Sequence, residues 1–312
     1  MNQDNFIKTC HWEITKRCNL SCRHCISSAG KKSELNTTKA LKIIDILNNL
    51  GYQELYITGG EPLTRKDIFK ILARAKKYKF KIGLLTNGML INNKNIKEIK
   101  KYISEIGISL DGSCAKINDK IRGNKSFQKI IRTIRIVKQN KIPITLYTTI
   151  NKINIDNFDK TLKLSIKLGI NNIRINEISL RGRAFKNRKI FKINKLQINL
   201  RKYLIETLTK HFKQKKEKIF LSDNCDIDSK TIFISPTGYL YPCIEIFQKN
   251  PSRHSGNILN YDSKKFKKYI GFLLKLQTKK NKCPYHFIVG KKFAICLNNM
   301  CHKCVYTKTI KS

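Results

Sequence analysis

Apolar strand patterns alternate with amphipathic helix patterns from residue 11 to residue 177 of this 312-residue chain. The predicted strands span residues 11–15, 54–58, 81–86, 106–110, 144–150 and 172–177. The predicted helices span residues 36–50, 67–78, 94–102, 126–140 and 156–168. Strands that alternate with helices pair in parallel through right-handed crossovers. The alternation therefore predicts an α/β fold, a partial (β/α)6 parallel barrel.

Polar motifs follow four of these strands directly. They are the cysteine loop at 18–25, Gly-Gly-Glu-Pro at 59–62, Thr-Asn-Gly at 86–88 and Ser-Leu-Asp-Gly at 109–112. In parallel barrels the C-terminal ends of the strands meet on one side, and the chemistry takes place there. The sequence therefore predicts a site on that side, with these four loops around it.

The cysteine loop carries three thiols, Cys18, Cys22 and Cys25, at C-x3-C-x2-C spacing. A short loop of this kind can place three sulfurs around one metal centre and leave a coordination position open. Iron–sulfur clusters are held by cysteine thiolates, often four of them, so three thiolates would leave one iron for a substrate or cofactor. The alternative is a three-thiolate zinc site that His24 or His11 completes.

The spacing of this loop, with the ring of His24 before the last cysteine, resembles the cluster loop of radical S-adenosylmethionine (SAM) enzymes. The resemblance implies that Cys18, Cys22 and Cys25 bind a [4Fe–4S] cluster whose open iron binds SAM. The cluster would pass one electron to SAM, and the resulting 5′-deoxyadenosyl radical would abstract a substrate hydrogen. A one-electron donor such as ferredoxin or flavodoxin is implied as a partner.

The same resemblance implies a set of SAM-binding residues. They are His24, Gly59, Gly60, Glu61, Ser109, Arg122 and Leu180. The glycine loop is expected at the SAM amino group, since residues without side chains let a ligand approach the backbone. Ser109 is expected to bond the ribose, Leu180 to pack on adenine, and Arg122 to pair with the SAM carboxylate. Arg122 could instead be a solvated basic side chain, and no catalytic acid or base is assigned.

Six of the 11 cysteines lie in the C-terminal part of the chain. They are Cys225, Cys243, Cys283, Cys296, Cys301 and Cys304. The spacing Cys225-x12-Gly238-x4-Cys243 resembles the opening of the auxiliary-cluster domains called SPASM or Twitch, which occur in peptide-modifying and sulfatase-maturing radical SAM enzymes. The resemblance implies metal binding, with one auxiliary [4Fe–4S] cluster expected and zinc as the alternative.

The chain departs from the full SPASM pattern, because His286 stands where a cysteine is expected and the last three cysteines read C-x4-C-x2-C. Two domains are predicted, a radical SAM core at 8–215 and an auxiliary iron–sulfur domain at 216–312. The second contains a predicted hairpin with strands 231–235 and 239–243. The two remaining cysteines, Cys10 and Cys114, are expected to be buried small apolar residues.

Two classes of substrate, and one function without catalysis, are considered for this chain. A ribosomally made peptide is predicted, with a tetrapyrrole or cofactor precursor as the alternative. In sulfatase-maturing enzymes that resemble this chain, a catalytic Asp follows the cysteine at the position of Cys243. Here Ile244 stands at that position, which disfavours sulfatase maturation. A zinc-stapled nucleic-acid-binding protein without catalysis is the third hypothesis.

The net charge of +43 would attract an acidic peptide, anionic lipid or nucleic acid. Biased composition would explain it equally, since lysines are spread along the chain, so nucleic-acid binding is not inferred from charge. No run of 18 apolar residues and no signal-peptide layout occurs. The cytoplasm is therefore the expected location, with no membrane partner.

Overall fold

The computed structural model describes residues 8–30, 34–170, 172–193, 218–221, 231–241, 254–261, 264 and 266. All six C-terminal cysteines with a predicted metal-binding role lie outside the described residues. The radical SAM core predicted at 8–215 is described through residue 193, with short gaps, and the structure of that part is given below.

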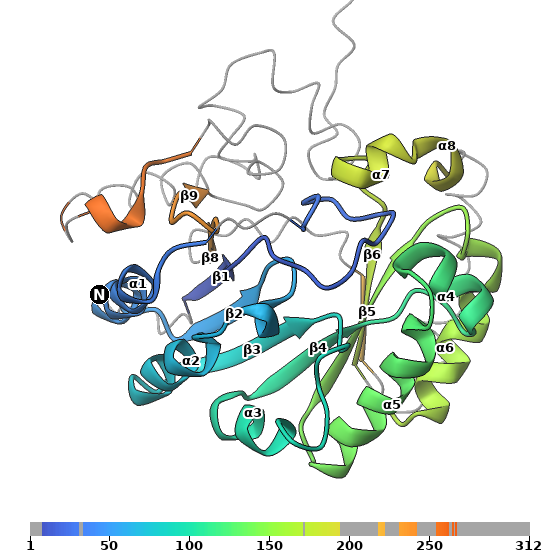
Figure 1. Ribbon diagram of the computed structural model, residues 1–312, viewed down its shortest axis with the longest axis horizontal. Helices are drawn as coiled ribbons and strands as arrows, with labels where there is room; N and C mark the ends of the chain where they lie inside the picture. Colours follow the sequence, from blue (N-terminus) through green and yellow to red (C-terminus); the bar gives the residue numbers. More distant parts are fainter. Residues whose placement is uncertain are drawn as a thin grey trace, which may run out of the picture.

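Within these ranges, nine strands form a single sheet in the order β7-β6-β5-β4-β3-β2-β1-β8-β9. The strands are β1 (Thr9–Glu13), β2 (Glu54–Thr58), β3 (Lys81–Thr86), β4 (Glu105–Ser109), β5 (Ile144–Ile150), β6 (Asn172–Glu177), β7 (Lys218–Leu221), β8 (Thr231–Ile234) and β9 (Leu240–Tyr241). Neighbouring strands are parallel except for β8 and β9. Figure 1 shows the strands β1 to β6 fanned side by side with helices outside them. The predicted partial barrel is confirmed.

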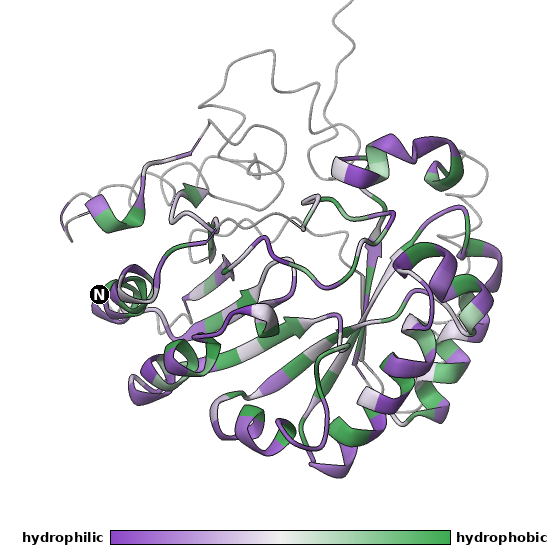
Figure 2. Cartoon of the chain, viewed as in Figure 1, coloured by the Kyte–Doolittle hydropathy of each residue, from purple (hydrophilic) through white to green (hydrophobic). Residues whose placement is uncertain are grey.

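The helices are α1 (Thr37–Asn49), α2 (Ile68–Lys77), α3 (Ile96–Tyr102), α4 (Ala115–Arg122), α5 (Ser126–Gln139), α6 (Phe158–Lys167), α7 (Gly182–Lys186) and α8 (Arg188–Phe191), with 3-10 turns η1 (Pro62–Thr64), η2 (Ile155–Asn157) and η3 (Ile258–Asn260). Helix α1 begins where the Asn36 side chain accepts a hydrogen bond from the Lys39 amide. Its apolar stripe is buried, whereas its other side is hydrophilic (Figure 2). Among the described residues, no helix is both long and apolar enough to cross a membrane.

The two faces of the sheet carry different side chains. Residues such as Trp12, Leu55 and Ile57 pack in the apolar core under the helices. Side chains alternate along a strand, so Tyr56 points to the opposite, inner face. A Cβ added to Gly83 would lie 2.5 Å from the Tyr56 ring, and glycine at this position therefore lets the ring lie against the strand.

The predicted hairpin is present as β8 and β9, where Phe233 pairs with Tyr241. Strand β8 also pairs in parallel with β1, so that Cys10 lies beside Ile232. At the opposite end of the sheet, β7 pairs with β6. The main sheet thus continues beyond residue 215, the boundary predicted between the two domains.

Helices α4 and α7 were not predicted, and one cysteine also differs from expectation. Helix α4 was not predicted, because its buried face carries Asn118 and Arg122 besides Ile121 and so lacks an apolar stripe. Cys10 is buried as predicted, but the prediction for Cys114 is wrong, since this residue is exposed. It lies at the N-cap of α4, in the connection after β4, where its side chain faces solvent.

Candidate functional site

The cysteine loop leaves the end of β1 and runs across the end of β2. The Gly60 amide donates to the Thr15 carbonyl at 2.8 Å, and the Glu61 amide donates to the Arg17 carbonyl at 2.8 Å. A Cβ on Gly59 would lie 2.5 Å from the Thr15 carbonyl oxygen, and one on Gly60 would overlap the Arg17 carbonyl. The two glycines therefore permit close approach of the chain's own backbone. Their contact with SAM stays a prediction.

Two of the three loop thiols, Cys22 and Cys18, have raised pKa values. Burial raises the pKa of Cys22 to about 11; the Arg122 guanidinium opposes this, and the nearby Cys25 and Cys18 sulfurs add to it. Burial likewise raises the pKa of Cys18. The Leu20 amide donates to Cys18 Sγ at 3.4 Å. Thiols of raised pKa are protonated at neutral pH, so metal binding here would release protons.

The zinc alternative considered from the sequence involves His24 and His11. In the described ranges, no three His, Cys, Asp or Glu side chains converge on a point that could hold one metal ion. His24 Nε2 lies 3.4 Å from Asp111 Oδ2, and the His11 ring stacks on Tyr56 at 4.9 Å. Both histidines considered as zinc ligands thus contact other protein side chains in the described structure.

Glu61 joins the end of β3 to the cysteine loop through Asn87. The Glu61 carboxylate is fully buried and accepts hydrogen bonds from Thr86 Oγ1 and from the amides of Asn87 and Leu63. The Asn87 side-chain amide in turn donates to Cys18 Sγ at 3.8 Å and to Asn19 Oδ1 at 2.8 Å. The side chain of Glu61 is thus directed at protein groups. Asn87, which the sequence analysis named only as part of the Thr-Asn-Gly motif, bonds directly to the cysteine loop.

Arg122 is buried on α4 with its Nε 2.7 Å from Asp111 Oδ2. Burial opposes its charge, but the carboxylate of Asp111 and the sulfur of Cys22 raise the pKa of Arg122 above its usual value. Asp111 is fully buried, and its Oδ1 accepts from the Thr149 amide at 2.7 Å. Arg122 is therefore not a solvated side chain. Its predicted pairing with the SAM carboxylate would use the guanidinium nitrogens other than Nε.

His24 is buried between this ion pair and α8. Its ring lies edge-on to Phe191, with ring centres 6.3 Å apart. Burial lowers the pKa of His24 to about 4, although Asp111 opposes the shift, so the imidazole is neutral at pH 7. Its Nδ1 is buried and has no hydrogen-bond partner in the described part of the chain.

The remaining predicted SAM contacts lie at two other strand ends. Ser109 is the last residue of β4 and pairs in register with Tyr147 of β5. Leu180 lies in the connection from β6 to α7. Both are partly exposed. Arg183, two residues into α7, donates from Nε to the Cys22 carbonyl at 2.8 Å. Arg183 was not among the residues predicted for the site.

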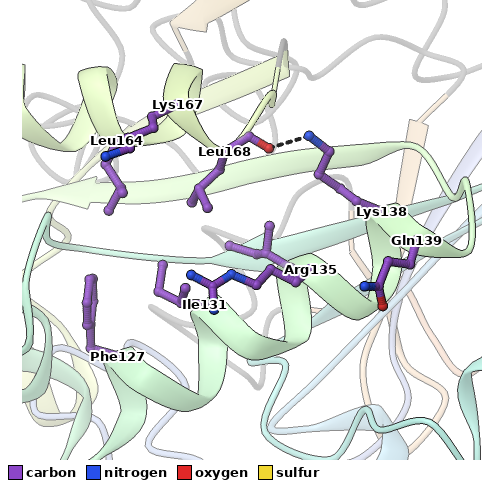
Figure 3. Close-up of a pocket in the computed structure, with 9 residues that line it drawn as sticks. Phe127, Ile131, Arg135, Lys138, Gln139, Leu164, Lys167 and Leu168 are labelled. Atoms are coloured by element: carbon purple, nitrogen blue, oxygen red, sulfur yellow. Dashed lines mark hydrogen bonds between the residues drawn. The ribbon is translucent and has the colours of Figure 1, made fainter.

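A separate surface groove of about 580 Å³ lies between α5 and α6 (Figure 3). Its apolar floor includes Phe127, Ile131 and Leu164, and Lys138 Nζ donates to the Leu168 carbonyl at one end. None of the predicted site residues lines it. The groove is therefore distinct from the site at the strand ends.

Residues 12–165 match the sequence profile of the Radical SAM superfamily. The AdoMet-dependent heme synthase of Methanosarcina barkeri is 32% identical over 163 residues, which cover 51% of this chain and 47% of that protein. The mycofactocin maturase MftC of Mycolicibacterium smegmatis is 31% identical over 178 residues, covering 55% of this chain and 45% of that protein. The chain spans about half the length of these two curated relatives.

Two solved structures share the fold. Streptococcus suis SuiB bound to the precursor peptide SuiA has a TM-score of 0.68 at 19% identity, covering 83% of this chain and 64% of SuiB. Native anSMEcpe with bound AdoMet and the Cp18Cys peptide has a TM-score of 0.70 at 17% identity, covering 98% and 91%. At these identities the likeness concerns the arrangement of strands and helices.

Proposed function

We propose that this chain, whose residues 12–165 match the Radical SAM superfamily profile, is a radical SAM enzyme that uses Cys18, Cys22 and Cys25 to hold the [4Fe–4S] cluster and acts on a ribosomally made peptide. When bound, the cluster and SAM supply a 5′-deoxyadenosyl radical that abstracts a hydrogen atom from the substrate. The protein's own residues bind and orient these groups and exclude water from them.

One observation carries the proposal: segments from four other strand ends contact the cysteine loop or the residues just before it. Asn87 after β3, Arg122 in α4 and Arg183 in α7 bond residues of the loop itself, and Gly60 after β2 bonds Thr15 just before it. These contacts fix the loop from several sides. Such an arrangement supports a site in which loop thiols and strand-end residues act on the same ligand.

The SAM contacts proposed here follow the resemblance, residue by residue. The backbone of Gly59 to Glu61 would face the SAM amino group, and Ser109 would bond the ribose. The Arg122 guanidinium, whose charge Asp111 favours, would pair with the carboxylate. Leu180 would pack on adenine and His24 would close the site below the loop.

A peptide substrate is supported by the similarity to the maturase MftC and by the fold shared with SuiB, which was solved with a precursor peptide. The charge of +43 suits an acidic peptide segment. The second candidate substrate is a tetrapyrrole, which the similarity to a heme synthase favours. In either case we propose an auxiliary cluster held by cysteines in 216–312 and an electron donor such as ferredoxin or flavodoxin.

The decisive experiment is anaerobic reconstitution of the full chain, followed by iron and sulfide analysis and a reductant-driven SAM-cleavage assay. About eight irons per chain with 5′-deoxyadenosine formed would support a core and one auxiliary cluster, at four irons each. About four irons would support the core cluster alone. Zinc without SAM cleavage would contradict the proposal.

The substrate is tested with the same preparation. A small acidic or cysteine-containing peptide encoded beside the gene is expected to lose two hydrogen atoms on crosslinking, as seen by mass spectrometry. An iron tetrapyrrole with propionate side chains is the comparison. Turnover of the tetrapyrrole with no change in the peptide would replace the first candidate by the second.

A further inference from the structure

The connection after β6 lies directly on the cysteine loop, although more than 150 residues separate the two in sequence. Arg183 Nε donates to the Cys22 carbonyl at 2.8 Å, and its Nη1 donates to the Ala29 carbonyl. The Arg183 backbone amide donates to the Cys25 carbonyl at 2.9 Å. Arg183 therefore bonds the segment 22–29 at three points, which lie before, at and after Cys25.

The residues around Arg183 are adapted to this contact. Gly182 has φ +51°, and a Cβ there would lie 2.7 Å from the Cys25 carbonyl oxygen and would overlap the Ile26 carbonyl. At the other end of α7, the Asn187 side-chain amide donates to the Arg23 carbonyl at 3.2 Å. Ala184 is fully buried. Gly182, Arg183 and Asn187 thus hold α7 against residues 22–29.

The loop needs such donors because it has little regular structure of its own. Its backbone polar groups must be paired by other parts of the protein when they leave water. Within residues 22–29 the described backbone bond is that from the Cys25 amide to the Cys22 carbonyl, at 3.2 Å. The spacing of the cysteines keeps their thiols in one site only if the chain between and beyond them holds one conformation.

We propose that Arg183 is a positioning residue that holds residues 22–29 in the conformation that binds the cluster. The inference rests on the proposed function, since it assumes that this loop is the cluster loop. Arg183 acts through the loop carbonyls and does not itself bind a reacting group. It also links the connection after β6, where Leu180 is expected to meet SAM, to two of the three ligands.

An arginine suits this task better than a lysine. The planar guanidinium presents several N–H donors at fixed angles, so it can bond the Cys22 and Ala29 carbonyls at once. A lysine ammonium keeps the charge but concentrates its donors at one point. Comparing Arg183→Ala with Arg183→Lys therefore separates the effect of the two-carbonyl contact from the effect of the charge.

The first test is hydrogen exchange of the full-length apoprotein, followed by mass spectrometry. In Arg183→Ala, the amides of residues 22–29 are expected to exchange about tenfold faster, since two hydrogen bonds to the loop are lost. Arg183→Lys should resemble the alanine variant more than the wild type. Exchange in α2 and α5 should not change. Arg188→Ala is the matched control, because Arg188 is exposed and donates to the Phe185 carbonyl in its own helix region.

The second test compares the reconstituted proteins. Arg183→Ala is expected to lose iron to a chelator about tenfold faster than the wild type, and its reduced cluster should give an altered electron paramagnetic resonance spectrum. If Arg183→Ala does not fold, the same comparison is made with Arg183→Lys. Unchanged loop exchange and unchanged chelation in the variants would overturn the inference.

Other outcomes would overturn either this inference alone or the proposed function as well. Faster exchange throughout the sheet, or full rescue by Arg183→Lys, would also overturn it, because Arg183 would then act on global stability or by charge alone. A wild-type protein that takes up no iron would instead overturn the proposed function, and this inference with it. The wild-type reconstitution thus separates the two failures.

Discussion

Asp111 and Arg122 form a buried ion pair, with Oδ2 and Nε 2.7 Å apart, directly beneath the cysteine loop. The Cys22 thiol donates to the backbone carbonyl of the same arginine at 3.6 Å. The strand-end motif Ser-Leu-Asp-Gly and the helix that follows it are thereby connected to the middle cysteine. Arg122, which the resemblance predicts to bind SAM, thus also forms a buried ion pair within the protein.

Asp111→Asn is expected to destabilise the protein by about 3 kcal/mol, because it leaves the Arg122 charge buried without its partner. Urea unfolding of the full chain measures the effect. Asp45→Asn is the matched control, since Asp45 pairs with Arg74 at the surface and its loss should change stability little. Equal unfolding midpoints for Asp111→Asn and Asp45→Asn would contradict the ion pair's importance.

Cys22→Ala is expected to abolish SAM cleavage, because two thiolates should not retain a cluster with an open iron. Cys114→Ala makes the same chemical change at an exposed cysteine outside the loop. It should keep the wild-type iron content and 5′-deoxyadenosine yield, measured by chromatography after anaerobic reduction. Deoxyadenosine at the wild-type rate from Cys22→Ala would refute the ligand assignment.

Asn87→Asp is expected to make the cluster harder to reduce. The substitution places a negative charge where a side-chain amide now donates to Cys18 Sγ at 3.8 Å. A lowering of the midpoint potential by about 60 mV corresponds to a tenfold change for one electron. Spectroelectrochemical titration measures it, with Asn140→Asp at the end of α5 as the control. Equal shifts in both variants would show that the contact is unimportant.

Glu13→Gln is expected to change how stability depends on pH. Glu13 lies at the end of β1, and burial raises its pKa to about 7, so the folded state binds its proton more tightly than the unfolded state. As the pH rises from about 4.5 to 7, keeping this carboxylate buried therefore costs increasingly more. The glutamine variant should gain on the order of 2 kcal/mol over wild type between pH 4 and pH 8.

Denaturant unfolding of the apoprotein at the two pH values gives this difference. Asp156→Asn, at an exposed position of η2, provides the control for a general change of charge and should show no such gain. A constant difference between Glu13→Gln and wild type at both pH values would exclude a buried Glu13 that titrates near neutrality.

The strands could be predicted because their apolar residues recur with the period of a half-buried sheet. Residues 54–58, 81–86, 144–150 and 172–177 form strands with the predicted bounds. Helix α4 was not predicted because its buried face is largely polar. The side chain of Asn118 on this face accepts a hydrogen bond from the Asp111 amide. The prediction for Cys114 was wrong for the same reason, because no pattern indicated that a helix begins beside it.

The site was predicted as a set of motifs, but not as a set of contacts. The spacing of Cys18, Cys22 and Cys25 shows which residues could share a metal centre. It does not show that Arg183 donates to the Cys22 carbonyl, because that contact depends on how β6 and β1 are placed in the sheet. Likewise, the pairing of Asp111 with Arg122 arises from the turn between β4 and α4.

The pairing of β8 with β1 has a consequence for any attempt to shorten the protein. Without residues 231–234, β1 would be paired on one side only, by β2. An unpaired strand edge is a template on which another chain can add its own strand, and such edges promote aggregation. A fragment that ends at residue 215 would expose this edge on β1, the strand that leads into the cysteine loop. By pairing with β1, β8 prevents another chain from adding a strand there.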